Sequence, residues 1–400
     1  MKRVHKVLLV IALVIGAGLA LAFVVYPLAY VVRVFLWQNS DVNDYRKFPE
    51  RRVAAGSATF DFMESPDEAR VRALFEADPA VDDLDAFLAE NHTQAFIVIQ
   101  DDRILYEKYF NDTRRDSIVT SFSTAKSFAS TLVGIAIAEG HIESVDEPIT
   151  DYLPELAERD PRFGDITIRH LLMMSSGIKY REVPFLHGDD TKTYYYPDLR
   201  ELALEQTKIV GPPGERFLYN NYHPLLLGLI LERATGTPVA HYLQEKIWQP
   251  LGMEFDASWS LDSEASGFEK MESGINARAI DFARFGRLFL NNGNWDGVQV
   301  VPAAWVAEAT QEDRSLDRAS YYPETAFFSG MDGYYTYMWW GLRREGDAYD
   351  FTAIGKYGQF IYVSPHKDLI IVRNGEDYGV DATEWLRLFY RVAGEIEAGP

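Results

Sequence analysis

The sequence of 400 residues is 47% hydrophobic, which is enough for a large core, and it shows no repeat or low-complexity tract, so a solenoid or a disordered chain is excluded. Its formal net charge of -21 excludes nucleic acid as an expected partner, because an acidic body repels phosphate backbones. The chain has no cysteine, which excludes thiolate nucleophiles, disulfides and cysteine metal sites.

The chain begins with a basic stretch, residues 1–6, followed by an uncharged apolar run over residues 7–32. This run exceeds the ~20 residues needed to cross a bilayer and the ~7–15 apolar residues of a cleaved signal peptide. We therefore predict an uncleaved, single-pass transmembrane signal anchor in the inner membrane. Because Lys2, Arg3 and Lys6 should stay cytoplasmic, the rest of the chain is expected on the periplasmic, extracytoplasmic side. The alternative is a buried core helix.

Residues 33–80 mix charge, proline and glycine with little periodicity, which is typical of a connector. Residues 81–400 show no second linker and are expected to form one globular domain with an inserted subdomain. Within it, residues 94–110 predict a β-hairpin with its turn at Asp101-Asp102.

Helical patterns follow the hairpin, and the first of them covers the stretch "STAKSFASTLVGIAIAEGH", where Gly140 suits a C-terminal cap. Two further strands, "FIYVSP" and "DLIIVRNG", lie near the C-terminus. Strands therefore occur at both ends of the domain and helices between them. This order predicts an α+β fold with one antiparallel sheet built from both ends of the domain, flanked by helices, and an inserted, mostly helical subdomain.

Ser123 and Lys126 form an S-x-x-K pattern in the first turn of that helix. Three residues are about one helical turn, so both side chains project from the same face. The helix N-terminus and burial would lower the pKa of Lys126, and a neutral lysine can accept the serine proton. The alternative is that Ser123 caps the helix and Lys126 points into water.

Tyr219 and Asn221 form a Y-x-N pattern before another helical segment. A tyrosine near a lysine can be partly ionised and act as an acid or base, and an asparagine amide can hold a substrate carbonyl or the lysine. The alternative is a core aromatic at Tyr219 and a helix N-cap at Asn221.

Lys356 and Gly358 form a K-x-G pattern, the only one in the chain, at the start of a strand. The lysine would place positive charge beside a pocket, and the glycine would let a substrate approach the strand closely. The amide of Gln359 could pair with that of Ser123 as an oxyanion hole. The alternative is an ordinary strand start with a solvated lysine.

Other patterns carry less information. The histidines show no H-x-x-x-H or H-E-x-x-H spacing, so neither a metal nor an organic cofactor is expected. The aromatic stretches "TYYYP" and "GYYTYMWWG" could line a pocket or pack in the core. Two more copies of S-x-x-K are expected to be chance matches, because they fall in turn-like stretches: Ser176-Lys179 and Ser364-Lys367.

In their order, the three motifs resemble those of the serine β-lactamase and penicillin-binding-protein superfamily. The tyrosine in the second motif resembles the one found there in the class C β-lactamase branch of this superfamily. That branch includes family VIII esterases, D-Ala-D-Ala peptidases and 6-aminohexanoate-dimer hydrolases. The resemblance covers about residues 80–395. It implies the following roles: Ser123 as nucleophile, Lys126 as its base, Tyr219 as proton shuttle to the leaving group, Asn221 and Lys356 as positioning groups, and Gly358 and Gln359 as the far wall with the Gln359 amide in the oxyanion hole.

Tyr357 departs from the family pattern, because it stands where the K-T-G motif has threonine. The resemblance implies that this threonine hydroxyl helps to grip a carboxylate, so β-lactam turnover is less expected than ester or amide turnover. The sequence therefore predicts a serine hydrolase of small esters or amides that works through an acyl-enzyme. A D-Ala-D-Ala carboxypeptidase, a β-lactamase and a non-catalytic binding protein remain alternatives, and the oligomeric state stays open.

Overall fold

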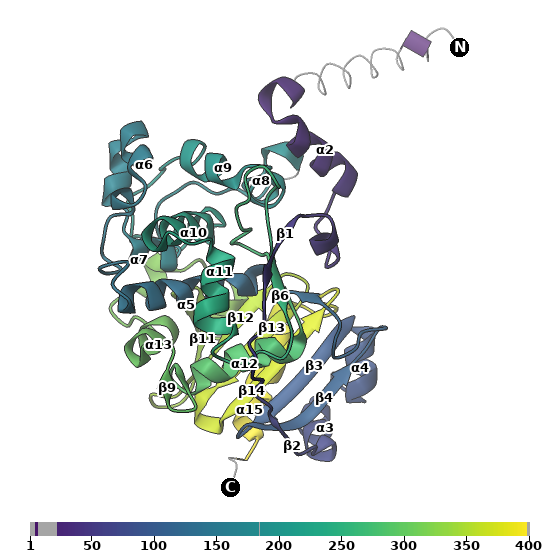
Figure 1. Cartoon of the computed structure of the whole chain (residues 1–400). Helices are drawn as coiled ribbons and strands as arrows, with labels where there is room; N and C mark the ends of the chain where they lie inside the picture. Colours follow the sequence, from purple (N-terminus) through teal and green to yellow (C-terminus); the bar gives the residue numbers. More distant parts are fainter. Residues whose placement is uncertain (1–4, 7–21, 184, 398–400) are drawn as a thin grey trace.

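The structure, a computed structural model, describes residues 5–6, 22–183 and 185–397. Its main sheet has eight strands: β2 (Met63–Glu64), β3 (Thr93–Gln100), β4 (Arg103–Tyr109), β10 (Gly333–Thr336), β11 (Trp339–Arg343), β12 (Tyr349–Gly355), β13 (Gln359–Ser364) and β14 (Leu369–Gly375). They lie in the order β10-β11-β12-β13-β14-β3-β4-β2 (Figure 1). All neighbours are antiparallel except the edge pair of β2 and β4.

The two ends of the domain meet in the middle of this sheet. β14 pairs with β3, with Ile371 opposite Val98, and β3 continues into β4 through a tight turn. Both turn residues, Asp101 and Asp102, have positive φ angles, as a two-residue hairpin turn of this kind requires. The predicted antiparallel sheet built from both ends is confirmed.

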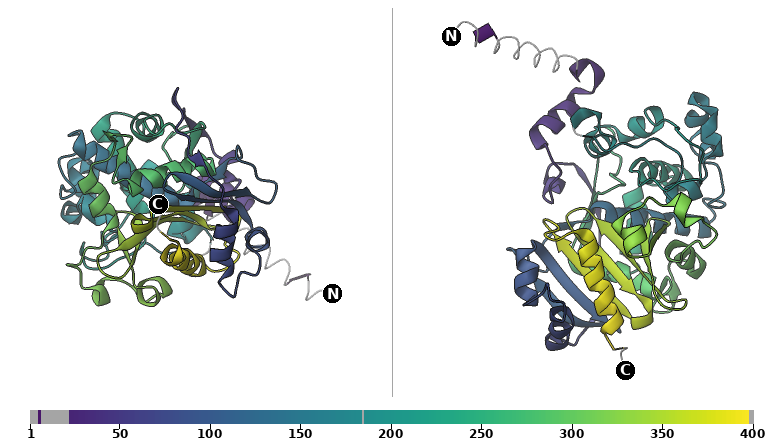
Figure 2. Two further views of the ribbon diagram at one scale, coloured as in Figure 1. Left: turned by 90° about the horizontal axis from the view of Figure 1, so that it is seen from below. Right: turned by 180° about the vertical axis from the view of Figure 1, so that it is seen from behind.

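Helices cover both faces of the main sheet, as Figures 1 and 2 show. One face carries α3 (Glu68–Glu76), α4 (Leu84–Glu90) and α15 (Ala382–Glu395), and the other carries α12 (Ala279–Leu290). Side chains alternate between these layers. Phe360 and Tyr362 contact Phe389 of α15, whereas Ile361 faces Gly286 of α12, which lets that helix lie close to the sheet.

The remaining helices form most of a second region beside the sheet, and this region is the predicted helical insertion. They are α5 (Ala125–Ala138), α6 (Pro154–Arg159), α7 (Ile168–Leu172), α8 (Asp189–Tyr195), α9 (Leu199–Glu205), α10 (Tyr222–Thr235), α11 (Val239–Leu243), α13 (Ala303–Thr310) and α14 (Arg318–Tyr321). α5 lies at its centre with residues 125–136 all buried, which is why its sequence has no charged, solvent-facing side.

Short helical turns and two small sheets complete the fold. The turns are η1 (Asp44–Arg46), η2 (Phe122–Thr124), η3 (Ile149–Asp151), η4 (Pro161–Asp165), η5 (Phe185–His187), η6 (Gln244–Trp248), η7 (Ala326–Gly330) and η8 (Pro365–Lys367). One small sheet has the order β1-β6-β7-β5, and the other is the hairpin β8–β9. Their bounds are β1 (Glu50–Val53), β5 (Val119–Thr120), β6 (Ala257–Ser260), β7 (Ile275–Ala277), β8 (Asn294–Trp295) and β9 (Val298–Gln299).

Residues 33–80, predicted to be a connector, are built into the domain. β1 pairs along its whole length with β6, and β2 adds to the edge of the main sheet. Before them, α2 (Leu28–Trp37) packs on the domain through Tyr30, Val31 and Val34, all of them buried. The low periodicity of this stretch reflects short elements that each bury only a few residues.

The predicted transmembrane anchor over residues 7–32 is wrong. Within residues 5–6, 22–183 and 185–397, no helix is both long enough and apolar enough to cross a membrane; residues 7–21 of the predicted span lie outside the described part. Pro27 has an extended ψ angle and separates α2 from the residues before it, and α2 has only 10 residues, or about 15 Å of helix. The predicted inner-membrane, periplasm-facing location rested on that anchor and is withdrawn with it.

Candidate active site

Ser123 and Lys126 are in direct contact at the start of α5. The Lys126 Nζ donates a hydrogen bond to Ser123 Oγ at 2.8 Å and another to the main-chain oxygen of Glu272 at 3.0 Å. Lys126 is only 1% exposed, and no side-chain cap bond is made by Ser123 at η2 or α5. The alternative of a capping serine and a solvated lysine therefore does not apply.

The surroundings of Lys126 favour its neutral form. Burial lowers the pKa of Lys126 to about 7, and the carboxylates of Glu272 and Glu182 act in the opposite direction. Burial has this effect because a charged ammonium loses its hydration in the protein interior. Near neutral pH a large fraction of Lys126 can thus accept a proton from the hydroxyl at 2.8 Å.

The backbone before Ser123 is held in an unusual conformation. Phe122 has a φ angle of 42°, in the left-handed region that a bulky side chain rarely adopts. Its ring is fixed between two tyrosines, stacked with Tyr194 and edge-on to Tyr357. This turn aims the Ser123 side chain out of the buried helix and into the cavity described below.

Tyr219 lies beside the same pair. Its ring centroid is 5.0 Å from Lys126 Nζ, and its ring packs against Tyr335 and Trp340. Burial raises the pKa of Tyr219 well above its ordinary value, and a hydrogen bond with Ser123 only partly opposes this effect. The phenol therefore carries its proton at neutral pH, and the partial ionisation considered from the sequence is not supported.

The two asparagines after Tyr219 have different environments. Asn220 is buried, and its Oδ1 accepts from the amide of Tyr222 at the start of α10. Asn221 makes no cap bond; its Nδ2 donates to the Tyr180 hydroxyl at 2.8 Å, and its buried Oδ1 has no partner. Asn221 thus stands at the N-cap position without capping the helix, the amide of Tyr222 is bound by Asn220 instead, and the Asn221 Oδ1 is left without a partner.

The K-x-G turn between β12 and β13 forms another wall. Lys356 is exposed and lines the cavity. Gly358 has a φ of 79°, and a Cβ there would lie 1.8 Å from the Arg373 guanidinium, so the glycine is required by turn and packing. The Gln359 side chain is buried and donates to Gly375 O at 2.7 Å. The role of its amide in an oxyanion hole stays a prediction.

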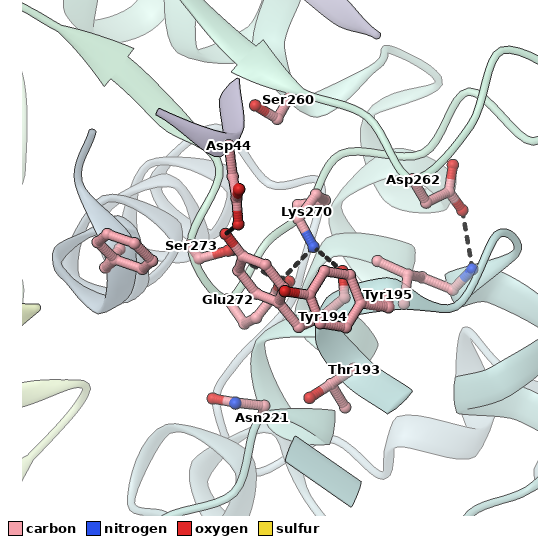
Figure 3. Close-up of polar contacts among 12 residues, drawn as sticks. Asp44, Thr193, Tyr194, Tyr195, Asn221, Ser260, Asp262, Lys270, Glu272 and Ser273 are labelled. Atoms are coloured by element: carbon pink, nitrogen blue, oxygen red, sulfur yellow. Dashed lines mark hydrogen bonds and ion pairs between the residues drawn. The ribbon is translucent and has the colours of Figure 1, made fainter. Parts of the chain in front are cut away.

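A second buried lysine is paired with Glu272, a residue of the cavity wall, as Figure 3 shows. Lys270 and Glu272, each 2% exposed, form an ion pair of 2.9 Å. Glu272 Oε1 also accepts from Ser273 Oγ at 2.8 Å, and its Oε2 is buried without a partner. Lys270 also donates to the main-chain oxygen of Tyr194. Sequence reasoning missed this pair, because nothing in the spacing of two ordinary charged residues indicates burial.

A cavity of about 310 Å³ joins these groups. It is lined by Gln38, Asn39, Ser40, Phe122, Ser123, Glu182, Asp190, Thr191, Tyr194, Tyr195, Tyr219, Asn221, Glu272, Ser273 and Lys356. The structure thus brings Ser123, Tyr219, Asn221 and Lys356 to one cavity, with Lys126 beneath it. The stretch "TYYYP" contributes two tyrosines to the wall, whereas "GYYTYMWWG" packs behind Tyr219. The contribution of residues 38–40 was also missed, because that segment was expected to be a connector.

The other two S-x-x-K serines lie elsewhere. Ser176 is buried and bonds to His223 Nε2 at 2.6 Å, and Ser364 Oγ donates to Asp350 at 2.7 Å. Neither serine lines the cavity. As for metals, the described residues hold no group of three or more His, Asp or Glu side chains that could bind an ion.

Comparisons with known proteins agree with this geometry. A family model described as Beta-lactamase matches residues 84–385. The 6-aminohexanoate-dimer hydrolase of Paenarthrobacter ureafaciens is 29% identical over 318 residues, which is 76% of this chain and 77% of that protein. Esterase EstB of Burkholderia gladioli is 30% identical over 156 residues, covering 35% of this chain and 38% of the esterase.

Solved structures show the same relationship. A Bacillus anthracis protein provisionally described as a 6-aminohexanoate-dimer hydrolase superposes with a TM-score of 0.73 at 25% identity, covering 88% of this chain and 91% of that one. A class C β-lactamase superposes with a TM-score of 0.60 at 17% identity, covering 84% and 98% of the two chains. At that identity the second likeness shows the fold alone.

Proposed function

This chain belongs to the beta-lactamase family and is a serine hydrolase, and we propose that it cleaves small esters or amides through an acyl-enzyme on Ser123. One observation carries the assignment of the nucleophile. Ser123 faces the cavity, and its hydroxyl contacts a buried lysine whose pKa is lowered to about 7. A serine needs such a base, because its free hydroxyl is a weak nucleophile.

In the first step Lys126 takes the hydroxyl proton while Ser123 Oγ attacks the substrate carbonyl carbon. The carbonyl oxygen becomes an oxyanion, for which the amides of Ser123 and Gln359 are the proposed donors. The tetrahedral intermediate then collapses, and the bond to the leaving alcohol or amine breaks. Tyr219, protonated at neutral pH, supplies the proton that the leaving group needs, and the Lys126 ammonium restores the tyrosine proton.

In the second step water attacks the acyl-enzyme, and the same groups act in reverse. Lys126, which is neutral again, takes a proton from the attacking water, and it returns that proton to Ser123 Oγ when the bond between Oγ and the acyl carbon breaks. Asn221 supports the substrate through its free Oδ1, which suits an N–H donor such as that of an amide substrate. Besides water, every step uses side chains and main-chain amides of this chain.

The relatives support an ester or amide substrate, since they include a 6-aminohexanoate-dimer hydrolase and an esterase. A D-Ala-D-Ala carboxypeptidase is the second candidate, because a protein of that name in Escherichia coli is 26% identical over 39% of this chain. Tyr357 stands in the K-x-G turn where the family motif has a threonine that helps to grip a carboxylate. Its presence favours substrates without a carboxylate over peptide or β-lactam substrates that carry one.

The test measures the rate of hydrolysis of p-nitrophenyl butyrate, and in parallel of amide substrates, by the wild-type full chain and by Ser123→Ala. We expect hydrolysis by the wild type and its loss in Ser123→Ala. Ser130→Ala is the matched control, because Ser130 lies on the same helix, is buried and has a hydroxyl without a hydrogen-bond partner. If Ser123→Ala kept the activity of the wild type, the assignment of the nucleophile would be wrong.

A further inference from the structure

A short N-terminal segment, residues 38–41, contributes to the wall of the cavity, and we call it the strap. Three of its residues, Gln38, Asn39 and Ser40, line the same cavity as Ser123. The family match begins only at residue 84, so the strap lies outside the matched residues. It contributes a wall that the family motifs do not describe.

Elements on each side hold the strap in place. On the α2 side, the Tyr30 hydroxyl donates to Leu186 O at 3.0 Å and Arg33 donates to Tyr195 O at 3.1 Å. On the other side, Asp44 accepts from the Tyr194 hydroxyl at 3.0 Å (Figure 3), and β1 is paired with β6. The strap is thus a fixed wall between two anchored ends.

Ser40 makes direct contacts with the K-x-G turn. Lys356 Nζ donates to Ser40 Oγ at 2.7 Å, and the Tyr357 hydroxyl donates to the main-chain oxygen of Ser40. Among the described residues, Lys356 is the only cationic side chain that lines the cavity. An ammonium at this point would otherwise be the natural partner of a substrate carboxylate, and here the strap supplies its acceptor.

The rest of the cavity wall repels anions. Its lining includes the carboxylates of Glu182, Asp190 and Glu272, and only Glu272 has a buried lysine as its ion-pair partner. The wall therefore carries two carboxylates without such a partner, Glu182 and Asp190, and one lysine, Lys356, which is already hydrogen-bonded to the strap. A substrate carboxylate would meet like charge on one side and an occupied cation on the other.

A larger cavity adjoins the first one at the strap. A second cavity of about 720 Å³ shares Gln38, Asn39, Glu182, Asp190 and Thr191 with the first, and it is otherwise lined by Val34, Phe35, Val183 and Phe185. Ser40 and Lys356 line only the first cavity, so the second one offers space on the α2 side of the strap for a longer substrate arm. The apolar residues at its far end suit an alkyl chain.

We propose that the strap is a specificity determinant, in which Ser40 takes the place of a substrate carboxylate at Lys356 and directs the enzyme to neutral or cationic esters and amides with an extended arm. The inference rests on the proposed function, because it concerns the substrate of the same site. It assigns to Ser40 a positioning role: the residue acts on substrates through Lys356 and takes no part in proton transfer.

The experiment measures a selectivity ratio for full-length variants. Each anionic ester, the p-nitrophenyl half-ester of succinate, glutarate or adipate, is paired with the neutral ester of the same chain length. The readout is kcat/KM for the anionic ester divided by kcat/KM for the neutral one, with Ser123→Ala as the blank for spontaneous hydrolysis. Three lengths are used so that the carboxylate samples different distances from Ser123.

We expect Ser40→Ala to raise this ratio about five-fold or more for at least one length, because a released ammonium can pair with the carboxylate. Ser40→Thr keeps the hydroxyl and should keep the wild-type ratio, whereas Ser40→Asp should lower it by pairing with Lys356. The gain in Ser40→Ala should disappear when Lys356→Met is added.

Three results would overturn the proposal: an unchanged ratio in Ser40→Ala at all three lengths, an equal rise in Ser40→Thr, or a gain that survives Lys356→Met. Each of them leaves the proposed function standing if the neutral esters are still cleaved above the Ser123→Ala blank. Absence of any cleavage by the wild type would instead refute the esterase function, and the strap proposal with it.

Discussion

Lys126 shows how one residue type can be a surface charge or a catalytic base according to its surroundings. Burial pushes its pKa down, while the Glu272 and Glu182 carboxylates pull it up. The outcome, about 7, lies between an ordinary lysine and a fully desolvated one. A base with a pKa near the working pH is well matched to proton transfer in both directions of a two-step reaction.

The pH dependence of the reaction should report this balance. Below a pH of about 7 Lys126 is protonated and cannot act as a base, so kcat/KM for p-nitrophenyl butyrate should rise with pH and level off above a midpoint near 7. Glu182→Gln removes a carboxylate that raises the pKa of Lys126, so the midpoint should move to lower pH by roughly a few tenths of a unit. Glu158→Gln, on the exposed side of α6, serves as the charge-matched control. An upward shift in Glu182→Gln would contradict this account.

Tyr219 should matter most where the leaving group needs a proton. Its raised pKa keeps the phenol protonated, so Tyr219→Phe should lower kcat/KM, which reports acylation, on an anilide or alkyl ester by about 10²-fold or more. The loss should be much smaller on p-nitrophenyl butyrate, because p-nitrophenolate leaves without a proton. Tyr321→Phe removes a buried hydroxyl that bonds to Met173 O and controls for packing. Equal losses on both substrate types would rule out proton donation by Tyr219.

At the scale of elements, the N-terminal region shows why a hydrophobic run does not determine one structure. The run over residues 7–32 has the length of a membrane span, yet Pro27 interrupts the backbone before α2 and α2 buries Tyr30, Val31 and Val34 against the domain. Composition alone cannot distinguish a helix that faces lipid from one that faces protein. The strap that follows α2 has no periodicity at all, so its position over the active site could only come from the structure.

Asp85 joins three elements on the outer face of the sheet. From α4 it accepts hydrogen bonds from Arg72 of α3 at 2.5 Å, from Lys108 of β4 at 3.0 Å and from the Tyr106 hydroxyl of β4. Partial burial is the largest single effect and would raise the pKa of Asp85, but the bonds from Arg72, Tyr106 and Lys108 together lower it to about 2. The ionised form is therefore preferred in the folded state.

The stability of the protein should depend on pH through this carboxylate. The folded pKa of Asp85 lies below its ordinary value of 3.8, so its contribution is fully present above pH ~4 and is lost as pH falls toward 2. Asp85→Asn should lower the free energy of unfolding at pH 7 by about 1 kcal/mol or less, since the group is partly solvated. Urea unfolding at several pH values should show the two proteins converging at low pH. A difference that grew on acidification would have the wrong sign.

Across the whole molecule, the sequence could predict those elements whose hydrophobic periodicity and turn residues lie within a short stretch of the chain. The hairpin at Asp101-Asp102, the helix after Ser123 and the paired C-terminal strands each carry their own periodicity and turn residues, and the order of strands and helices then predicted the sheet. The burial of Lys270 and Glu272 and the strap over the cavity depend on contacts between residues far apart in the chain. No local pattern encodes them, and the family resemblance does not reach residue 40.

Arg373 connects the two ends of the domain to the active-site wall. Its fully buried guanidinium donates to Thr93 Oγ1 at 3.1 Å, to Asn91 O at 2.6 Å and to Gly358 O at 2.8 Å, and it lies 4.1 Å from the ring centroid of Trp385 on α15. Arg373→Met leaves these acceptors buried without a donor, so it should lower the free energy of unfolding by about 2–4 kcal/mol. It should also lower kcat/KM, because the turn that carries Lys356 loses its support.

A double-mutant cycle tests whether this contact is specific. In Gly358→Ala the new Cβ would collide with the Arg373 guanidinium, in addition to the strain of a φ angle of 79°. Gly346→Ala is the matched control: Gly346 also has a positive φ of 69°, but nothing lies within 4 Å of its Cβ position, so only the backbone strain of about 1–2 kcal/mol applies. In the Arg373→Met background the collision disappears, so Gly358→Ala should then cost no more than Gly346→Ala. Coupling of this kind is expected only for residues in contact. Additive losses for Arg373→Met and Gly358→Ala in urea unfolding would mean that the turn and the arginine are stabilised independently.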